Sequence, residues 1–333
     1  MTTGESAAAA FAVAGAVVSV EPHPTGHIND AYLVVADGGR YLLQRLNPSV
    51  FAHPDAVMAN VVAVTDHLRN KGEPTLALVD SVDGAPSWRD QSGAVWRMYC
   101  YVDGAHPLAV KTPEDAALVG RAFGRFHRLL ADLDAGGLRV SLPGFHDPAL
   151  RVSQLTAAAE EDDHGRLAEV RDVVDELLTL REAVDADGAL SGLPHRVAHN
   201  DAKAANLLVQ GCGRAPTVVD LDTVMAGSVL WDVGDMVRSS TGTADESTAT
   251  VQFDAERYDA LVDAWLAQTG ELLTPDERGA VRSAGPVVTF EQTVRFLTDH
   301  IRGDVYFRVT VPGQNLERAR NQLQLLRSMV SAL

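Results

Sequence analysis

Residues 197–222 read VAHNDAKAANLLVQGCGRAPTVVDLD, and this stretch decides how the rest of the chain is interpreted. It contains the pattern H-x-D-x-K-x-x-N from His199 to Asn206, flanked by short apolar runs, and Asp220 follows at the end of the next predicted strand. Phosphoryl transfer needs few protein groups: one that orients the attacking hydroxyl, oxygen ligands for Mg²⁺, and cations that offset phosphate charge. The stretch supplies all three kinds and therefore predicts a phosphotransferase.

Three residues of the pattern, and the acid that follows it, each fit one of these roles, while His199 is expected to fix the loop. Asp201 is the candidate catalytic residue that accepts the proton of the substrate hydroxyl, and Lys203 is available to the γ-phosphate. Asn206 offers an amide oxygen and Asp220 a carboxylate to Mg²⁺, which prefers such hard oxygen ligands. Asp222 lies on the same strand face as Asp220, so it either shares the metal or anchors the loop.

Composition narrows the classes of partner. The chain has 333 residues, of which 46% are hydrophobic and 22% charged, which excludes global disorder and suits two lobes. Its net charge of −17 argues against nucleic acid or an anionic membrane as partner. The longest apolar run, residues 7–20, is too short to span a bilayer and has no basic leader. The two cysteines form no C-x-x-C pair, so we expect reduced thiols and a cytoplasmic location.

Periodicity and turn signals divide the chain near residue 103. Before Asp103-Gly104, strands are predicted at 17–21, 31–36, 41–46, 75–79 and 94–102, with one helix that begins at Pro54. After it, helical patterns cover 112–133, 148–184, 231–238, 254–268, 275–301 and 316–331. We therefore expect an α+β protein of two lobes: a small antiparallel sheet lobe with one helix (1–102) and a larger, mainly helical lobe (103–333).

Other common catalytic motifs are absent. No Gly-Lys dipeptide occurs, so the sequence has no Walker-type phosphate loop. Pro216 occupies the third glycine position of the only near-match to a dinucleotide fingerprint, and neither H-E-x-x-H nor G-x-S-x-G is present.

The catalytic stretch and the sheet-then-helix order resemble the aminoglycoside phosphotransferase and choline kinase superfamily, relatives of the protein kinases. The chain looks most similar to the N-acetylhexosamine kinases that phosphorylate the anomeric hydroxyl. The segments that carry this closer likeness are 26–30, 41–47, 145–147, 199–203, 220–225, 295–299, 303–307 and 315–320. The resemblance runs from about residue 15 to 330. It implies a two-lobed protein-kinase-like fold, with ATP and Mg²⁺ as cofactors.

The resemblance also implies a set of nucleotide-binding residues. The turn at Gly26 would lie over the phosphates, although a single glycine in a turn by itself indicates only positive φ. His27 and Asn29 would reach phosphate or substrate. Arg45 corresponds to the strand lysine that touches the phosphates in kinases, and because strand residues alternate, only one of Gln44 and Arg45 can face the cleft. A solvated edge arginine is the alternative, since the helix that follows has no Glu for the usual ion pair.

Two further segments match the superfamily. The strand 96–104 resembles the hinge that binds adenine, with the backbone of Cys100 and Val102 as candidate partners. Residues 231–235 resemble a helix-start motif, where Asp232 and Asp235 would cap the helix and buttress the catalytic loop.

The acceptor pocket of the related sugar kinases is closed by residues near the C-terminus. Arg295, Asp299 and Tyr306 lie in the corresponding segment, and Arg295 and Tyr306 would bind sugar hydroxyls together with His27 and Asp201. Because Arg295 and Asp299 are four residues apart on a predicted helix, an ordinary surface ion pair is the alternative.

These observations predict an ATP-dependent small-molecule kinase whose preferred acceptor is the anomeric hydroxyl of an N-acetylhexosamine. An aminoglycoside, another amino sugar or choline is the alternative acceptor. A catalytically inactive nucleotide-binding module is a further alternative, against which the intact pattern argues. A protein kinase is disfavoured, since no D-F-G or A-P-E follows the catalytic loop. The sequence leaves open the exact acceptor, the nucleotide preference and the oligomeric state.

Overall fold

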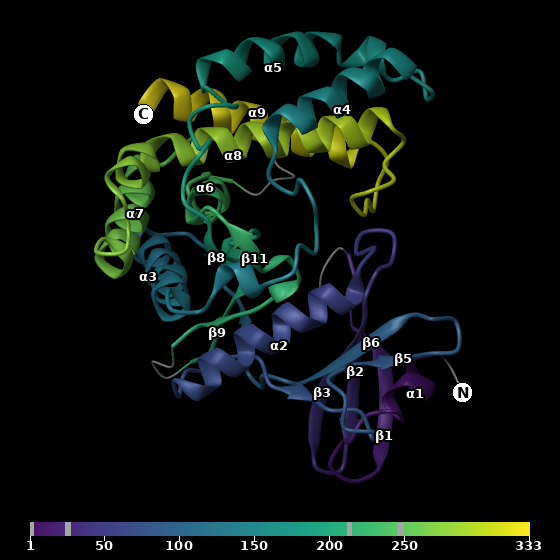
Figure 1. Cartoon of the computed structure of the whole chain (residues 1–333). Coiled ribbons are helices and arrows are strands. Elements are labelled where there is room, and N and C mark those ends of the chain that lie inside the picture. The colour runs from purple at the N-terminus through teal and green to yellow at the C-terminus, as the bar shows by residue number, and fades with distance from the viewer. Residues whose placement is uncertain (1–2, 24–27, 212–214, 245–249) are drawn as a thin grey trace. The chain divides into compact units, whose positions relative to one another are not determined.

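The computed structural model describes residues 3–23, 28–211, 215–244 and 250–333. Its elements divide into two compact units (Figure 1). The first comprises Met1–His106, Gly136–Leu142 and Leu208–Met225, and the second Pro107–Ala135, Pro143–Leu207 and Ala226–Leu333. The first boundary between the units, after His106, falls close to the expected boundary at residue 103. The segment that carries Asp220, however, belongs with the sheet and not with the helices.

The first unit is built on an antiparallel sheet with strand order β1-β2-β3-β6-β4, and β5 pairs with β6. Its main elements are α1 (Thr3–Ala8), β1 (Val17–Pro22), β2 (Asp30–Ala36), β3 (Gly39–Arg45), α2 (Pro54–Asn70), β4 (Leu78–Val79), β5 (Trp88–Arg89) and β6 (Val95–Cys100). This order confirms the predicted sheet lobe with its helix after the third strand. The short helix α1, within the N-terminal alanine-rich run, was not predicted.

Strand alternation sorts the side chains of β3 and β6 onto two faces of this sheet. Leu43, Trp96 and Met98 point into an apolar core that includes Ala7 of α1. Gln44 lies opposite Arg97 in the register of the two strands, and period-two alternation places this pair on the other face. Gln44 and Arg97 therefore lie on the face of the sheet opposite this apolar core.

The second unit is helical and centres on α8 (Pro275–Ile301), which packs against α4, α6 and α9 (Figure 1). The other helices are α3 (Pro113–Leu130), α4 (Pro148–Glu161), α5 (Arg171–Ala183), α6 (Val229–Ser240), α7 (Ala255–Thr269) and α9 (Gln314–Ala332). The single helical pattern expected over 148–184 is two helices. The chain breaks between them because Asp162 and Gly165 adopt left-handed φ angles of 40° and 63°. Within the described ranges, no helix combines the length and the apolar character needed to cross a bilayer.

Short strands and single turns of 3₁₀ helix complete the fold. The strands are β7 (His106–Pro107), β8 (Arg196–Ala198), β9 (Leu207–Val209), β10 (Thr217–Val218) and β11 (Met225–Gly227). The turns are η1 (Ala135–Gly137), η2 (Leu167–Glu169), η3 (Ala204–Asn206) and η4 (Leu221–Thr223). The candidate catalytic loop runs from the end of β8 through η3.

A glycine controls the close approach of α6 to α8. A Cβ on Gly234 would collide with the side chain of Val288 and with the carbonyl of Ala284. A Cβ on Gly279, also within a helix, would meet nothing within 4 Å. Gly234 is therefore required by packing, whereas Gly279 is not.

Two alanine substitutions should consequently have opposite effects on stability. Gly279→Ala should raise the free energy of unfolding by about 0.5–1 kcal/mol, the usual gain at an exposed helix position. Gly234→Ala should lower it by about 1–3 kcal/mol, because overpacking outweighs the same helix-propensity gain. Denaturant unfolding monitored by circular dichroism measures both, and a Gly234→Ala variant as stable as Gly279→Ala would contradict the packing interpretation.

Candidate active site

The catalytic loop of the second unit is held by Asp232, in the first turn of α6. The backbone N–H groups of His199 and Asn200 donate to its two carboxylate oxygens at 2.7 and 2.6 Å. His127 Nε2 lies 2.8 Å from Asp232, and the indole N–H of Trp265 donates to Nδ1 of the same ring at 3.0 Å. Burial by itself would raise the pKa of Asp232, but the hydrogen bond from His127 and further donors lower it. An ionised carboxylate thus fixes the start of the loop.

The same helix holds the far end of the loop. The backbone N–H of Ala204 donates to the Ser239 hydroxyl at 3.1 Å, and that hydroxyl donates to the carbonyl of Asp235 at 2.8 Å. Asp235 also forms a buried ion pair with Arg238 at 2.8 Å. The expected buttressing of the loop by this helix therefore has a direct structural basis. The expected capping by Asp232 and Asp235 is wrong, because the N-cap of α6 is Ser228.

Asp201 lies between the two anchors and is linked to Lys203 and Asn206. Lys203 Nζ donates to Asp201 Oδ2 at 2.6 Å, and Asn206 Nδ2 donates to the same oxygen at 2.9 Å and to the Asp201 carbonyl at 2.8 Å. Burial would raise the pKa of Asp201, but the Lys203 ammonium and these hydrogen bonds hold it well below its ordinary value. The structure thus groups three of the predicted site residues around one carboxylate.

Asn206 Nδ2 makes both of these bonds, so neither of them uses the Asn206 amide oxygen. That oxygen has the chemistry of a ligand for a hard cation. His199 has a supporting role: its Nδ1 accepts the backbone N–H of Asp201 at 3.3 Å, and its ring packs edge-on against Phe123 and Phe126.

In the first unit, Asp222 is a buried anchor. One of its oxygens pairs with Arg97, and the other accepts a hydrogen bond from Asn29 at 2.7 Å. Arg97 and Asp222 are only 1% and 2% exposed. Burial lowers the pKa of Arg97, but the Asp222 carboxylate more than reverses this and raises it. Of the two roles that the sequence left open for Asp222, the geometry favours the anchor over the metal ligand.

Asp220 differs from Asp222 in both exposure and backbone. It is exposed, and it adopts a left-handed conformation with φ 61° and ψ 56°. Such a backbone in a residue other than glycine costs free energy and occurs often at functional sites. Asp220 thus remains the candidate metal ligand of this segment.

The sheet face occupied by Asp222 is that of Gln44 and not that of Arg45. Arg97 Nε donates to Gln44 Oε1 at 3.0 Å, which ties Gln44 to the pair. Arg45 lies opposite Trp96 in the register, on the other face, where its guanidinium is 3.8 Å from Asp30. Of the two residues between which the sequence left the choice open, Gln44 therefore shares a face with Asp222, and the candidate phosphate contact Arg45 lies on the opposite face. The buried cation beside Asp222 is Arg97.

Arg97 was missed by sequence reasoning, although a signal for it exists. It is a charged residue within the otherwise apolar run 95–100, and a charge buried in a strand needs a partner.

Asn29 is also an anchor in the structure. Its Nδ2 bonds Asp222, and its amide oxygen accepts the backbone N–H of Asn47 at 3.0 Å. Both ends of its amide are thus engaged within the protein, which favours a positioning role for Asn29 over the expected contact with phosphate or substrate. Gly26 and His27 lie outside the described residues.

At the predicted hinge, two backbone N–H groups already form hydrogen bonds with neighbouring segments. The N–H of Cys100 donates to Ala77 at 2.8 Å, and that of Tyr101 donates to Arg40 at 3.0 Å. Cys100 therefore cannot donate its N–H to a base without breaking a sheet hydrogen bond, which leaves Val102 as the better candidate.

Near the C-terminus, Arg295 is surrounded by aromatic rings. Its guanidinium carbon lies 5.0 Å from the centroid of Phe145, 5.7 Å from Tyr306 and 5.5 Å from Phe307. Arg295 also approaches the Tyr306 hydroxyl at 3.4 Å. The two predicted acceptor residues are therefore neighbours.

Asp299 bonds to the loop that follows α8, in contrast to the surface ion pair with Arg295 that the sequence offered as an alternative. It is buried and accepts the backbone N–H groups of residues 305, 306 and 307 at 2.8–3.0 Å and the side-chain amide of Asn315 at 2.8 Å. Asp299 thus shapes the loop that carries Tyr306.

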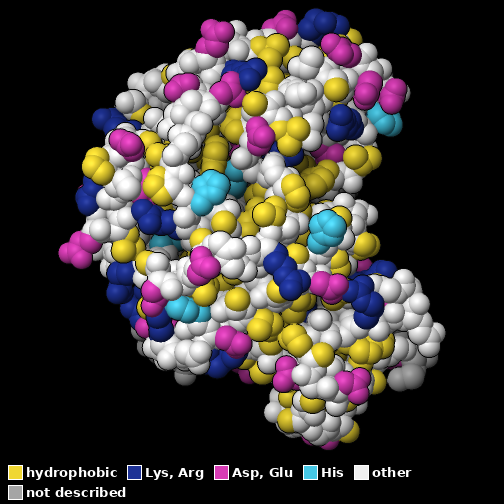
Figure 2. Space-filling view, in the orientation of Figure 1, with side chains coloured by type: hydrophobic (Ala, Val, Ile, Leu, Met, Phe, Trp, Pro, Cys, Tyr) yellow, Lys and Arg dark blue, Asp and Glu magenta, His cyan; other side chains and the backbone are white. Residues whose placement is uncertain are grey.

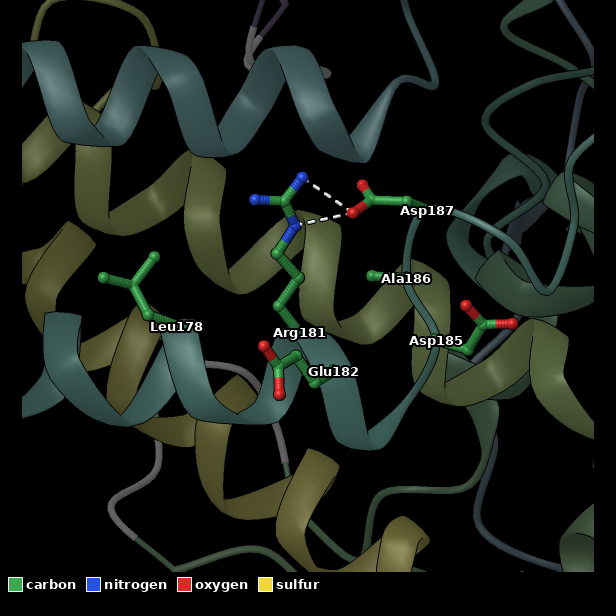
Figure 3. Close-up of a pocket in the computed structure, with 6 residues that line it drawn as sticks. All are labelled: Leu178, Arg181, Glu182, Asp185, Ala186 and Asp187. Carbon is green, nitrogen blue, oxygen red and sulfur yellow. Dashed lines mark hydrogen bonds and ion pairs between the residues drawn. The ribbon is translucent and has the colours of Figure 1, made fainter.

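A pocket of about 560 Å³ lies elsewhere in the second unit, where α5 ends (Figure 3). Leu178, Arg181, Glu182, Asp185, Ala186 and Asp187 line it, and Arg181 pairs with Asp187 at 2.7 Å. It includes none of the predicted site residues, so we do not assign the chemistry to it.

Comparison with known proteins identifies the family. The model of the phosphotransferase enzyme family matches residues 19–274, which is most of the chain. The chain belongs to this family. The stretch 197–222 lies within the matched residues.

Solved structures show the same kinase-like fold, with an N-terminal antiparallel sheet and helix followed by a mainly helical part. An aminoglycoside phosphotransferase from Alicyclobacillus acidocaldarius is 14% identical with a TM-score of 0.64, covering 99% of this chain and 96% of that one. A microcompartment-associated aminopropanol kinase is 16% identical with the same TM-score, covering 99% and 98%. An amicoumacin kinase in complex with AMP-PNP, Ca²⁺ and Ami is 13% identical with a TM-score of 0.62, covering 96% and 91%.

The two acidic residues of the 220–222 segment should respond differently to neutralisation. Asp222→Asn leaves the Arg97 charge buried without its counter-charge, and breaking such a pair typically costs about 3–5 kcal/mol. Asp220→Asn should change the free energy of unfolding by less than about 1 kcal/mol, because the side chain is exposed and Asn tolerates its left-handed backbone. Denaturant unfolding measures both.

A double variant tests whether the unpaired buried charge of Arg97 causes this loss of stability. Arg97→Met combined with Asp222→Leu should be more stable than either single variant, because it removes both charges together. Equal stability of Asp222→Asn and Asp220→Asn would contradict the anchoring role of Asp222.

Proposed function

We propose that this phosphotransferase is an ATP-dependent sugar kinase that phosphorylates the anomeric hydroxyl of an N-acetylhexosamine. The observation that carries the choice of acceptor is the positive charge around Arg295. Arg151 lies close enough to interact electrostatically with Arg295, while the nearby carboxylate of Glu291 is buried and already faces His146 at 2.8 Å. A cationic acceptor such as choline or an aminoglycoside would meet like charge here, whereas a neutral sugar would not.

The whole-chain charge does not decide this question. On the face shown in Figure 2, acidic and basic side chains are interspersed over the surface. The net charge of −17 therefore says less about the acceptor than the residues around Arg295 do.

The neighbours of Arg295 suit a polyhydroxylated ring. Phe145, Tyr306 and Phe307 restrict the planar guanidinium, whose donors can bind two oxygens at once. The Tyr306 hydroxyl adds a further donor and acceptor. An N-acetylhexosamine offers hydroxyls and an amide carbonyl to such groups, which supports this acceptor class over a simple alcohol.

Asp201 would orient the attacking hydroxyl and receive its proton. Because Lys203 lowers the pKa of Asp201, the carboxylate is ionised at neutral pH and a weak base. Its main contribution is thus orientation, with proton transfer late, as the anomeric oxygen bonds to the γ-phosphorus and the bond to ADP breaks. Lys203 would offset the charge that develops on the transferred group.

The donor set suits Mg²⁺ and ATP. Asn206 offers an amide oxygen and Asp220 an exposed carboxylate, and we propose these as the metal ligands in place of Asp222. When bound, the ion neutralises charge on the β- and γ-phosphates. From the resemblance we keep the Gly26 turn and the Val102 backbone as nucleotide contacts and His27 as an acceptor contact, and we propose a cytoplasmic reaction.

A coupled assay of ADP release tests the acceptor. With MgATP, N-acetylglucosamine should be phosphorylated faster than glucosamine, choline or an aminoglycoside, and phosphorus NMR should locate the new phosphate on the anomeric carbon. Turnover with an aminoglycoside or choline alone would replace the proposed acceptor. ATP binding without ADP release for any acceptor would favour the inactive module.

Substitutions at the acceptor residues should then affect the sugar and not the nucleotide. Tyr306→Phe should raise the KM for the sugar about fivefold and Arg295→Ala about 10–100-fold, since neutral and charged hydrogen bonds differ by such amounts. The KM for ATP should stay within about twofold, because both substitutions remove uniform binding of the acceptor.

Arg302→Ala is the matched control, because Arg302 is an exposed arginine at the C-terminal end of α8. It should leave both KM values unchanged. If Arg295→Ala behaves like Arg302→Ala, the residues around Arg295 do not bind the acceptor.

A further inference from the structure

His146 connects the catalytic loop to the central helix of the second unit. Its Nε2 lies 3.0 Å from the carbonyl oxygen of Asn200, and its Nδ1 lies 2.8 Å from Glu291 Oε2 on α8. The ring stacks on Trp231 of α6, with centroids 4.9 Å apart and an interplanar angle of 4°. His146 is therefore held from three sides.

The two partners determine how many protons the ring carries. A carbonyl oxygen only accepts, and an ionised carboxylate only accepts. A neutral imidazole has one N–H, so one of its nitrogens would present a lone pair to an oxygen. An imidazolium satisfies both contacts. His127 differs from His146 in this respect. Its Nδ1 accepts the Trp265 N–H, so a single ring proton, on Nε2, satisfies its contact with Asp232.

The surroundings of Glu291 favour its ionised form. Its other oxygen accepts the backbone N–H of Asp147 at 2.9 Å and lies 3.8 Å from Arg151 Nε. Burial would raise the pKa of Glu291, but the charge of His146, followed by those of Arg295 and Arg151, lowers it. Burial likewise would lower the pKa of His146, but the Glu291 carboxylate raises it despite the opposing charge of Arg295.

The bond from His146 falls on the peptide unit that precedes the Asp201 side chain. That peptide has its carbonyl on Asn200, which bonds His146, and its N–H on Asp201, which bonds His199. Asn200 has a left-handed φ of 61°, a conformation that persists where neighbours hold it. Rotation of this peptide would move the carboxylate of Asp201.

We propose that His146 is a positioning residue for phosphoryl transfer: as an imidazolium bonded to Glu291 and to the Asn200 carbonyl, it fixes the peptide that presents Asp201. The inference rests on the role proposed for Asp201 but not on the identity of the acceptor.

The effect of pH follows from the sign of the shift. Because the pKa of His146 is raised in the folded protein, the contribution of its charged form is complete at low pH and is lost as pH rises through that pKa. The charged groups around the ring are Glu291 and Arg295 of α8, Arg151 of α4 and Asp147 beside it, while α6 contributes Trp231. Glu291→Gln removes the carboxylate that raises the pKa, so the alkaline fall of kcat should move to lower pH.

Two substitutions separate the bond to Asn200 from general packing. His146→Gln can place an amide N–H near the position of Nε2, whereas His146→Asn can reach only that of Nδ1. His146→Asn should lower kcat about 10²-fold, a usual effect of misplacing a catalytic group by about 1 Å. His146→Gln should stay within about tenfold of the wild type, and the KM for MgATP should change less than about twofold in both.

ADP release is measured with the best acceptor of the panel, below the melting temperature of each variant, and His53→Gln serves as an exposed histidine control. Equal kcat values for the Gln and Asn variants would overturn the proposal. An alkaline limb unmoved by Glu291→Gln would overturn it as well.

The charge state has its own test, which does not depend on turnover. Long-range ¹H–¹⁵N spectra of the histidine rings should show both nitrogens of His146 protonated at pH 7 in the wild type. A non-protonated ring nitrogen in the wild type at pH 7 would exclude the imidazolium. If no acceptor is turned over, the proposed kinase function fails while this spectrum still decides the state of His146.

Discussion

The buried carboxylate of Asp232 is the constraint on which the catalytic loop depends. It is completely inaccessible to solvent, and a charge so placed is tolerated only where several donors surround it. Two of those donors are the backbone N–H groups of His199 and Asn200, the residues immediately before Asp201. The position of Asp201 is thus set by the start of α6. The last turn of the same helix holds Ala204 through Ser239.

The first unit uses the same physical solution around Asp222. There the buried carboxylate pairs with Arg97 and binds Asn29, whereas Asp220, two residues earlier, is exposed. In each unit a buried, fully bonded acid supports a neighbouring acid that solvent can reach. Asp220 and Asp222, although two residues apart, are therefore suited to different purposes: a buried carboxylate with bonded partners can act as an anchor, whereas only an accessible carboxylate can meet a ligand.

The sequence predicted the order of sheet and helices well, because turn residues and apolar periodicity are local signals. It also predicted the grouping of Asp201, Lys203 and Asn206, which lie within a single short loop. The sequence left the choice between Gln44 and Arg45 open, since a shift of one residue exchanges the two faces of a strand and no local signal fixes which face meets Asp222. Arg97 and His146 were missed for a related reason: their partners, Asp222 and Glu291, are more than a hundred residues away.

Asp201 is proposed to orient the acceptor hydroxyl during transfer from ATP, and every other proposed role depends on this one. The most direct measurement is kcat for ADP release by Asp201→Asn, with ATP affinity measured on the same sample. Asparagine keeps the shape of the side chain but removes the carboxylate that accepts the proton. We expect a fall of about 10²–10⁴-fold in kcat with nearly unchanged ATP binding. A variant that retains more than about a tenth of the wild-type kcat would contradict it.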